Sequence, residues 1–161
     1  MNSGQTLLTL GGIVLLSFVM LTFYQSQGST TEMTIFNEAL ITSTGVAQTV
    51  IEELASKEFD ENTITVILES ADLLTLPMSL GPETGEDNLH LFDDIDDFNG
   101  YSRTDSLSRL GNFDIEVDVY YIKFEEPDSI VNVRTFYKLA TVSVYNAYMV
   151  DTLTLSYTSS Y

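Results

Sequence analysis

An uncharged, apolar stretch near the beginning of the chain limits what the rest can fold into. Residues 7–24 read LLTLGGIVLLSFVMLTFY, and no charged side chain occurs before Glu32. As an α-helix rising about 1.5 Å per residue, this stretch spans roughly 27 Å, close to the hydrocarbon thickness of a bilayer. Thr9, Ser17 and Thr22 fit such a helix because a hydroxyl can donate a hydrogen bond to a backbone carbonyl one turn earlier. A buried core helix is the alternative, but the stretch is apolar on all sides and lies near the N-terminus, so the sequence predicts a membrane-length helix.

A cleaved secretory signal is the alternative interpretation of this stretch. Such a signal has a basic region before the apolar stretch and a small-x-small cleavage site after it. Residues 1–6 contain no Lys or Arg, and the segment QSQGSTTEM that follows Tyr24 has no convincing small-x-small pair. We therefore expect the helix to remain as a single-pass anchor, with the short leader in the cytoplasm and the acidic bulk outside.

The rest of the chain is strongly acidic. Its 24 Asp and Glu against 6 Lys and Arg give a formal net charge of −18. Nucleic-acid binding draws its affinity from cationic side chains, so we expect no nucleic-acid partner. A negative charge of this size suits divalent cations or a basic patch on a neighbouring subunit as partners. The alternative is that the acidity only keeps the domain soluble. The absence of cysteine from the sequence excludes disulfides and thiolate chemistry.

A second helical pattern follows Gly28. Ser29 and Glu32 have capping-box spacing, which indicates that the helix is interrupted near Gly28 and restarts. Residues 29–59 then form an amphipathic helix. Its apolar stripe is expected to consist of Phe36, Leu40, Ala47, Ile51 and Leu54.

The periodicity becomes that of β-strands after Phe59, so residues 60–161 are predicted to form a globular domain with an antiparallel meander. The predicted strands are residues 63–68, 113–124, 131–145 and 153–157, and residues 80–110 are predicted to be an acidic loop. The predicted inward-facing and core positions are Phe113, Ile115, Val117, Val119, Tyr121, Phe136, Leu139, Val142 and Val144, and Leu153, Leu155 and Tyr157 alternate in the last strand. One face of the sheet would be covered by the amphipathic helix, which makes the fold class α+β.

The densest group of candidate ligands lies in the predicted loop. It consists of Asp93, Asp94, Asp96, Asp97 and Asn99. Hard oxygen ligands just before a glycine are typical of calcium sites, although this spacing does not complete an EF-hand-like loop. The alternatives are a solvated acidic loop, or a patch that faces Arg103 and Arg109 of the same or a neighbouring subunit.

The sequence contains no recognisable catalytic constellation. His90 is the only histidine, and no Ser or Cys nucleophile motif accompanies it. Gly11 and Gly12 lie within the apolar stretch, where they allow close helix packing, and they do not form a phosphate-binding loop. We therefore expect no enzymatic activity and no cofactor, with calcium as the one candidate ligand.

A short leader ending in glycine, a membrane-length helix, an amphipathic continuation and an antiparallel meander together resemble the type IV pilin and pseudopilin superfamily. The leader is Met1-Asn2-Ser3-Gly4, followed by Gln5-Thr6-Leu7-Leu8-Thr9. Residues 47–61 (AQTVIEELASKEFDE) and 92–101 (FDDIDDFNGY) are similar to stretches of minor pilins of the MSHA type. The resemblance implies that prepilin peptidase cuts between Gly4 and Gln5 and that the new N-terminus is methylated. It also implies four parts: residues 1–4, 5–28, 29–59 and 60–161.

The resemblance implies a structural subunit of a type IV pilus or a type II secretion-like filament. Its partners would be copies of itself or other pilin-like subunits, and it would lie in the inner membrane before joining a cell-surface or periplasmic filament. Most family members carry a glutamate where this chain has Thr9, and some tip-located minor pseudopilins lack it too, so a minor or pseudopilin-type role is implied. The residues expected to mediate assembly are Leu7, Leu8, Leu10, Ile13, Val14, Leu15, Leu16, Phe18, Val19 and Leu21.

A function from another class also fits the sequence. A membrane-anchored extracytoplasmic module that never polymerises would use the same apolar helix only as a tether. Its acidic loop would then bind calcium or a basic ligand. Processing separates the two hypotheses, because a filament subunit loses residues 1–4 and a tethered module keeps Met1.

Overall fold

The structure is a computed structural model that describes residues 2–64 and 66–161, with Ser29 described by its backbone alone. A long helix is followed by four short 3₁₀ helices and five strands. The helices are α1 (Ser3–Ala55), η1 (Glu61–Thr63), η2 (Ala71–Leu73), η3 (Pro77–Ser79) and η4 (Asp96–Phe98). The strands are β1 (Tyr101–Leu107), β2 (Gly111–Lys123), β3 (Glu126–Val131), β4 (Tyr137–Asn146) and β5 (Leu153–Ser160). The predicted α+β class is confirmed.

The chain divides into two compact units, one up to Glu38 and one from Ala39 onward. From Ser3 onward the first unit is part of α1, and the helix runs through Gly28 without interruption, so the predicted break there is wrong. A single glycine costs a helix only about 1 kcal/mol relative to alanine. The hydroxyls of Thr30 and Thr31 donate to the Ser26 and Gln27 carbonyls, as in regular helix. The Ser29 side chain, half of the predicted capping box, lies outside the described residues.

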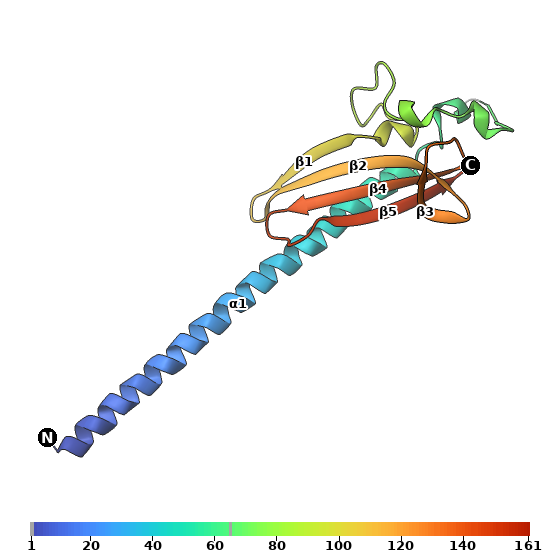
Figure 1. Cartoon of the computed structure of the whole chain (residues 1–161). Helices are drawn as coiled ribbons and strands as arrows, with labels where there is room; N and C mark the ends of the chain where they lie inside the picture. Colours follow the sequence, from blue (N-terminus) through green and yellow to red (C-terminus); the bar gives the residue numbers. More distant parts are fainter. Residues whose placement is uncertain (1, 65) are drawn as a thin grey trace. The chain divides into compact units, whose positions relative to one another are not determined.

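The second unit contains a five-stranded antiparallel sheet with β2 at its centre (Figure 1). Val117 of β2 pairs with Tyr101 of β1 and with Val142 of β4, so these two strands occupy opposite edges of β2. β3 pairs with β2 farther along, from Tyr121 to Lys123, and β5 pairs with the outer edge of β4. The sheet is therefore antiparallel but departs from the predicted simple meander, because β3 pairs only with the end of β2 and the chain then crosses to the other edge of β2 to form β4.

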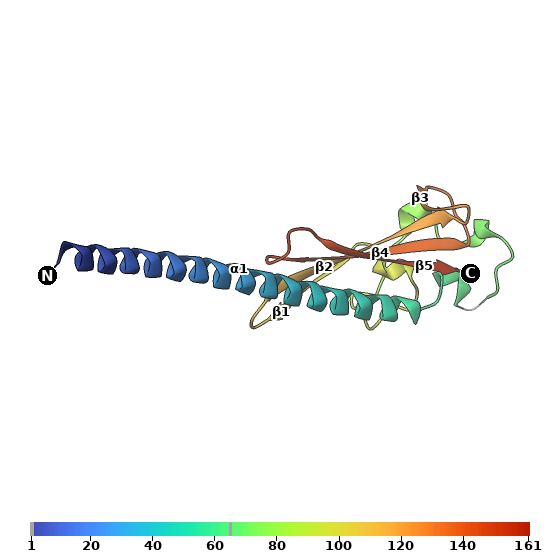
Figure 2. The same ribbon diagram turned by 90° about the horizontal axis from the view of Figure 1, so that it is seen from below.

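The alternation predicted for β2 is confirmed. Phe113, Ile115, Val117, Val119 and Tyr121 are all buried on one face, whereas the residues between them are mostly exposed. β4 contributes Ala140, Val142 and Val144 to the same buried face. The part of α1 that begins at Ala39 lies against this face, as the two views of the ribbon show (Figures 1 and 2).

The buried stripe of α1 is turned relative to the predicted one. It consists of Ala39, Ser43, Ala47, Val50 and Leu54. Ala47 and Leu54 were expected there, but Phe36, Leu40 and Ile51 are only half-buried. Alanine and serine lie at the contact because small side chains let a helix approach a sheet closely. The Ser43 hydroxyl lies 3.1 Å from the Met149 sulfur, within hydrogen-bonding distance, just beyond β4.

Three predicted boundaries differ from the structure. The described residues of the stretch 63–68 are not assigned to a strand, and η1 ends at Thr63. Thr65 lies outside the described residues. β1 lies inside the stretch predicted as a loop, so the irregular part is shorter than residues 80–110. The predicted strand 131–145 begins later than expected: Val131 is the last residue of β3, and β4 starts at Tyr137. Between them the Thr135 hydroxyl bonds the Ile122 and Tyr137 carbonyls, and this contact fixes the turn.

Candidate functional site

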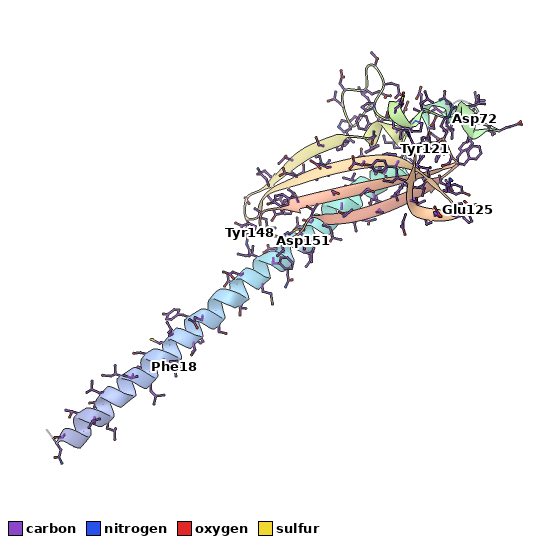
Figure 3. All side chains as sticks on the ribbon, in the orientation of Figure 1. Phe18, Asp72, Tyr121, Glu125, Tyr148 and Asp151 are labelled. Carbon is purple, nitrogen blue, oxygen red and sulfur yellow. The ribbon has the colours of Figure 1, made fainter. Side chains whose placement is uncertain are left out.

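The ten residues predicted to mediate assembly lie on the first unit of α1 and expose 56–79% of their surface. Phe18, labelled in Figure 3, is typical at 66%. Apolar side chains point outward all around this part of the helix, and the described part of the chain buries none of its most hydrophobic window. By length and composition this helix is able to span a membrane.

The hydroxyl groups in this apolar segment bond back to the helix itself. Thr9 donates to the Gln5 carbonyl at 3.1 Å, and Ser17 donates to the Ile13 carbonyl at 2.8 Å. The Thr22 hydroxyl donates to the Phe18 carbonyl at 3.2 Å. These bonds confirm the expectation that the three hydroxyls are compatible with an apolar environment.

The five predicted calcium ligands all lie in or beside η4, and three of them are buried. Asp94, Asp96 and Asp97 have no exposed surface, whereas Asp93 is exposed. Backbone bonds to Glu58 hold this segment beside the chain that leaves α1: the Glu58 N–H donates to the Asp93 carbonyl at 3.2 Å. The sequence does not predict this burial, since runs of aspartate are usually solvated.

Much of the hydrogen-bonding capacity of these carboxylates is used within the segment. Asp94 Oδ1 accepts the N–H groups of Asp96 at 2.6 Å and Asp97 at 3.2 Å. Asp97 Oδ2 accepts those of Asp93 at 2.9 Å and Asp94 at 3.2 Å. The two carboxylates thus close a compact turn around η4, as aspartates commonly do with nearby backbone groups.

Asn99 and Arg103 have other partners than those predicted. The Asn99 amide donates to the Leu80 carbonyl and accepts the Val119 N–H, both at 3.0 Å, so it joins the loop to β2. Arg103 forms an ion pair with Asp105 at 3.2 Å on the same strand. Both residues therefore have structural contacts of their own beside the acidic segment.

A buried lysine lies beneath the acidic segment. Lys138 of β4 is fully buried, and its ammonium group donates to the Phe59 carbonyl at 2.7 Å, to Asp60 at 2.9 Å and to Asp96. The Phe59 ring centroid is 4.4 Å from the nitrogen. The sequence predicts Leu139 as the core residue here, but Leu139 is only half-buried because Lys138 occupies the inward position. Alternation alone places a lysine outside, so the pattern missed it.

The two aspartates that contact Lys138 differ in their acidity. Burial raises the pKa of the Asp96 carboxyl to about 7, and the attraction of Lys138 offsets this only in part. Burial also acts on Asp60, but Lys138 and the backbone N–H groups of Thr75 and Asn62 outweigh it. The pKa of Asp60 therefore lies below its usual value of 3.8. Tyr121, labelled in Figure 3, adds a hydroxyl that donates to Asp60 at 3.2 Å.

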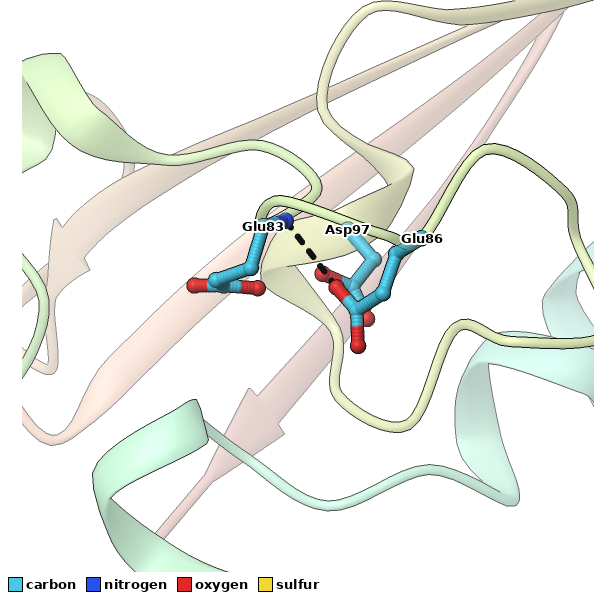
Figure 4. A group of neighbouring side chains, drawn as sticks. All are labelled: Glu83, Glu86 and Asp97. Carbon is cyan, nitrogen blue, oxygen red and sulfur yellow. Dashed lines mark hydrogen bonds between the residues drawn. The ribbon is translucent and has the colours of Figure 1, made fainter.

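A second acidic group opens to solvent on the other side of Asp97. Glu83, Glu86 and Asp97 bring one carboxylate oxygen each to within 4.8 Å of one another (Figure 4). They line a pocket of about 490 Å³. The Glu83 N–H donates to the Glu86 carboxylate at 3.0 Å. Neither glutamate was predicted from the sequence as a metal ligand, because both lie in a separate loop and no spacing rule connects them to Asp97.

Among the described residues, this is the group of three acidic side chains whose positions suit a metal ion. It contains Asp97 but none of Asp93, Asp94 and Asp96. Burial and the two neighbouring carboxylates raise the pKa of Glu83 to about 8.

No protein-family model matches the chain, and the comparisons with curated proteins and with solved structures gave no match.

Proposed function

We propose that the chain is a structural subunit, of minor or pseudopilin type, in a type IV pilus or a type II secretion-like filament. One observation carries the proposal. α1 is 53 residues long, and its apolar residues 7–24 are exposed on all sides, whereas its turns from Ala39 onward pack on the sheet. A helix of this kind serves its own domain at one end and leaves the other end for partners outside the chain.

The physical chemistry of the exposed segment favours assembly. Each Å² of apolar surface that leaves water contributes about 25 cal/mol, so this segment is stable only in a bilayer or against other apolar surfaces. A subunit that leaves the membrane must therefore pack its helix against sister helices. Heterologous contacts that do not close into a ring produce a helical filament. The acidic second unit, which has the polar surface, would remain in water.

Processing and location follow from the same proposal. Prepilin peptidase would cut between Gly4 and Gln5, both of which are exposed at the start of α1. The subunit would be held in the inner membrane by residues 5–28, with its second unit on the extracytoplasmic side. It would then join a cell-surface or periplasmic filament made of like or related subunits.

The N-terminus of the protein in two cell fractions tests the proposal. The protein is isolated from sheared surface filaments and from membranes, and its intact mass and N-terminal sequence are determined. The proposal expects a chain that begins at Gln5 and carries one added methyl group in the filament fraction. A chain that keeps Met1 and occurs only in membranes would contradict it.

A Gly4→Leu variant provides the matched control. No atom lies within 4 Å of a Cβ placed at Gly4, so the substitution leaves the fold intact. If the peptidase cuts after Gly4, this variant keeps residues 1–4 and is absent from the filament fraction. Equal recovery of the variant and the wild type in filaments would show that cleavage at this bond is not required.

A membrane-anchored module that does not polymerise is the second candidate. The solvent-open pocket lined by Glu83, Glu86 and Asp97 favours it, because a filament subunit does not require a ligand site. Membrane-confined protein with intact Met1 would support this candidate. Cross-linking between neighbouring α1 helices would argue against it.

A further inference from the structure

We infer that Glu83, Glu86 and Asp97 form a binding site for one divalent cation, with Ca²⁺ as the ion that fits best. This inference does not rest on the proposed function, since it concerns the second unit alone. It also differs from the sequence-based prediction, which placed calcium among Asp93, Asp94, Asp96, Asp97 and Asn99.

The spacing of the three carboxylates suits a single ion. Their nearest oxygens lie within 4.8 Å of one another. Oxygen ligands bind Ca²⁺ at about 2.3–2.6 Å, so two oxygens on opposite sides of one ion are roughly 5 Å apart at most. All three carboxylates therefore reach the same ion without rearrangement of the backbone.

Asp97 provides an independent indication of a ligand. Its side chain is fully buried, and its Oδ2 accepts two backbone N–H groups. Its Oδ1 has no hydrogen-bond partner among the described residues. Figure 4 shows the Asp97 carboxylate beside that of Glu86, which is itself an acceptor. A buried carboxylate oxygen without a donor costs about 1–3 kcal/mol or more, and a cation removes this cost.

The surroundings of the group leave room for the ion and its water ligands. The pocket of about 490 Å³ is also lined by Asp87 and Ser102, and none of the described residues that line it is basic. No lysine or arginine among these lining residues therefore fills the position that a metal ion would take. The open side allows water to complete the six to eight oxygen ligands that Ca²⁺ takes.

The ligand chemistry selects the ion. The donors are carboxylate oxygens, and the chain contains no cysteine and a single histidine, His90, which does not line the pocket. All-oxygen sites favour Ca²⁺, Mg²⁺ or Mn²⁺ over zinc and copper. Mg²⁺ requires near-ideal octahedral geometry, whereas Ca²⁺ accepts irregular groups of carboxylates. A net charge of −18 further raises the local concentration of divalent cations.

A bound ion would join two separate parts of the second unit. Glu83 and Glu86 belong to the loop before η4, and Asp97 belongs to η4 itself. Asn99, two residues after Asp97, is bonded to β2 through the Val119 N–H. Ca²⁺ would therefore fasten an exposed loop to the rigid part of the sheet and stabilise the folded second unit.

Calorimetric titration of the full chain in detergent tests the inference. The protein is first stripped with a chelator and then titrated with CaCl₂ and, separately, with MgCl₂. We expect one Ca²⁺ per chain with a dissociation constant of about 10⁻⁵–10⁻³ M, the range of open carboxylate sites, and weaker binding of Mg²⁺. Ca²⁺ should also raise the midpoint of thermal unfolding.

Two double variants separate a specific site from general acidity. Glu83→Gln/Glu86→Gln keeps the shape of both side chains, and we expect it to weaken Ca²⁺ binding at least tenfold and to abolish the thermal shift. Glu116→Gln/Asp118→Asn removes the same charge from the exposed face of β2, and its binding should stay within twofold of wild type. Equal losses in both variants, or no stoichiometric binding by the wild type, would overturn the inference.

Discussion

The Lys138 ammonium lies 2.9 Å from the Asp60 carboxylate, and neither side chain has any exposed surface. Lys138 belongs to the strand next to the central one, and Asp60 follows the end of α1, so 78 residues separate them in the sequence. The same ammonium bonds Asp96 of η4. One cation thus connects the segment after the long helix, the acidic turn and the sheet.

Replacement of Lys138 should strongly destabilise the second unit. Lys138→Met keeps the length of the side chain but leaves Asp60 and Asp96 without their cation in a buried position. Breaking a buried pair by removing one partner costs about 3–5 kcal/mol. Urea unfolding followed by circular dichroism should show this loss. Lys123→Met, at the exposed end of β2, should change the unfolding free energy by less than about 0.5 kcal/mol.

Stability should fall at low pH because of Asp60. Its pKa is lower in the folded chain than its usual value of 3.8, so the unfolded chain takes up this proton first as the pH falls. The contribution of Asp60 is therefore complete above that value and is lost as the pH falls through the lower native pKa. The advantage of wild type over Asp60→Asn in unfolding free energy should therefore narrow as the pH falls below about 5. Asp118→Asn, which removes a carboxylate from an exposed position of β2, is the matched control.

The tight approach of α1 to the sheet should make Ala47 sensitive to size. Ala47 has no exposed surface, so Ala47→Leu inserts three carbon atoms into a filled contact. Overpacking of this kind typically costs about 1–3 kcal/mol. Gln48→Leu, one position along on the exposed side of the helix, should change stability little. Equal effects of the two substitutions in thermal unfolding would mean that the helix presents a different side to the sheet.

Membrane association should depend on the apolar character of the first unit. Aspartate at the centre of a membrane-spanning helix costs about 2.5–3.5 kcal/mol, so Leu15→Asp/Val19→Asp costs roughly 5–7 kcal/mol. We expect this variant to move from the carbonate-resistant membrane fraction to the soluble or aggregated fraction. Val133→Asp/Val150→Asp, on exposed parts of the second unit, adds the same charge and should remain in the membrane. If both variants stay in the membrane, the segment does not anchor the chain.

The sequence predicted those parts of the fold in which one residue pattern determines the outcome. β2 was predicted within two residues because its apolar and acidic residues alternate and only one face can be buried. The apolar character of residues 7–24 likewise indicated a helix without internal partners. β1 was missed because its residues, YSRTDSL, have no apolar alternation, and it forms a strand only because it pairs with β2.

The candidate sites could not be predicted in full because they depend on contacts between distant residues. Lys138 is buried only where Asp60 and Asp96 approach it, and the local sequence around Lys138 gives no sign of either. Asp97 was identified as a candidate ligand, but the carboxylates that group with it for a metal ion are those of Glu83 and Glu86, and not those of its neighbours in the sequence. Charge and spacing indicated the acidic segment, whereas the fold decided which carboxylates converge.

The inward hydrogen bonds of Thr9, Ser17 and Thr22 have a consequence for how the first unit meets its surroundings. Because these donors are satisfied within the helix, the segment presents an almost entirely apolar surface to its neighbours. Dispersion contacts with such a surface change little as the helix turns about its own axis. Apolar contacts would therefore hold a bundle of these helices together without fixing the rotation of each helix about its axis. The orientation of each copy would have to be set by the parts of the chain that remain in water.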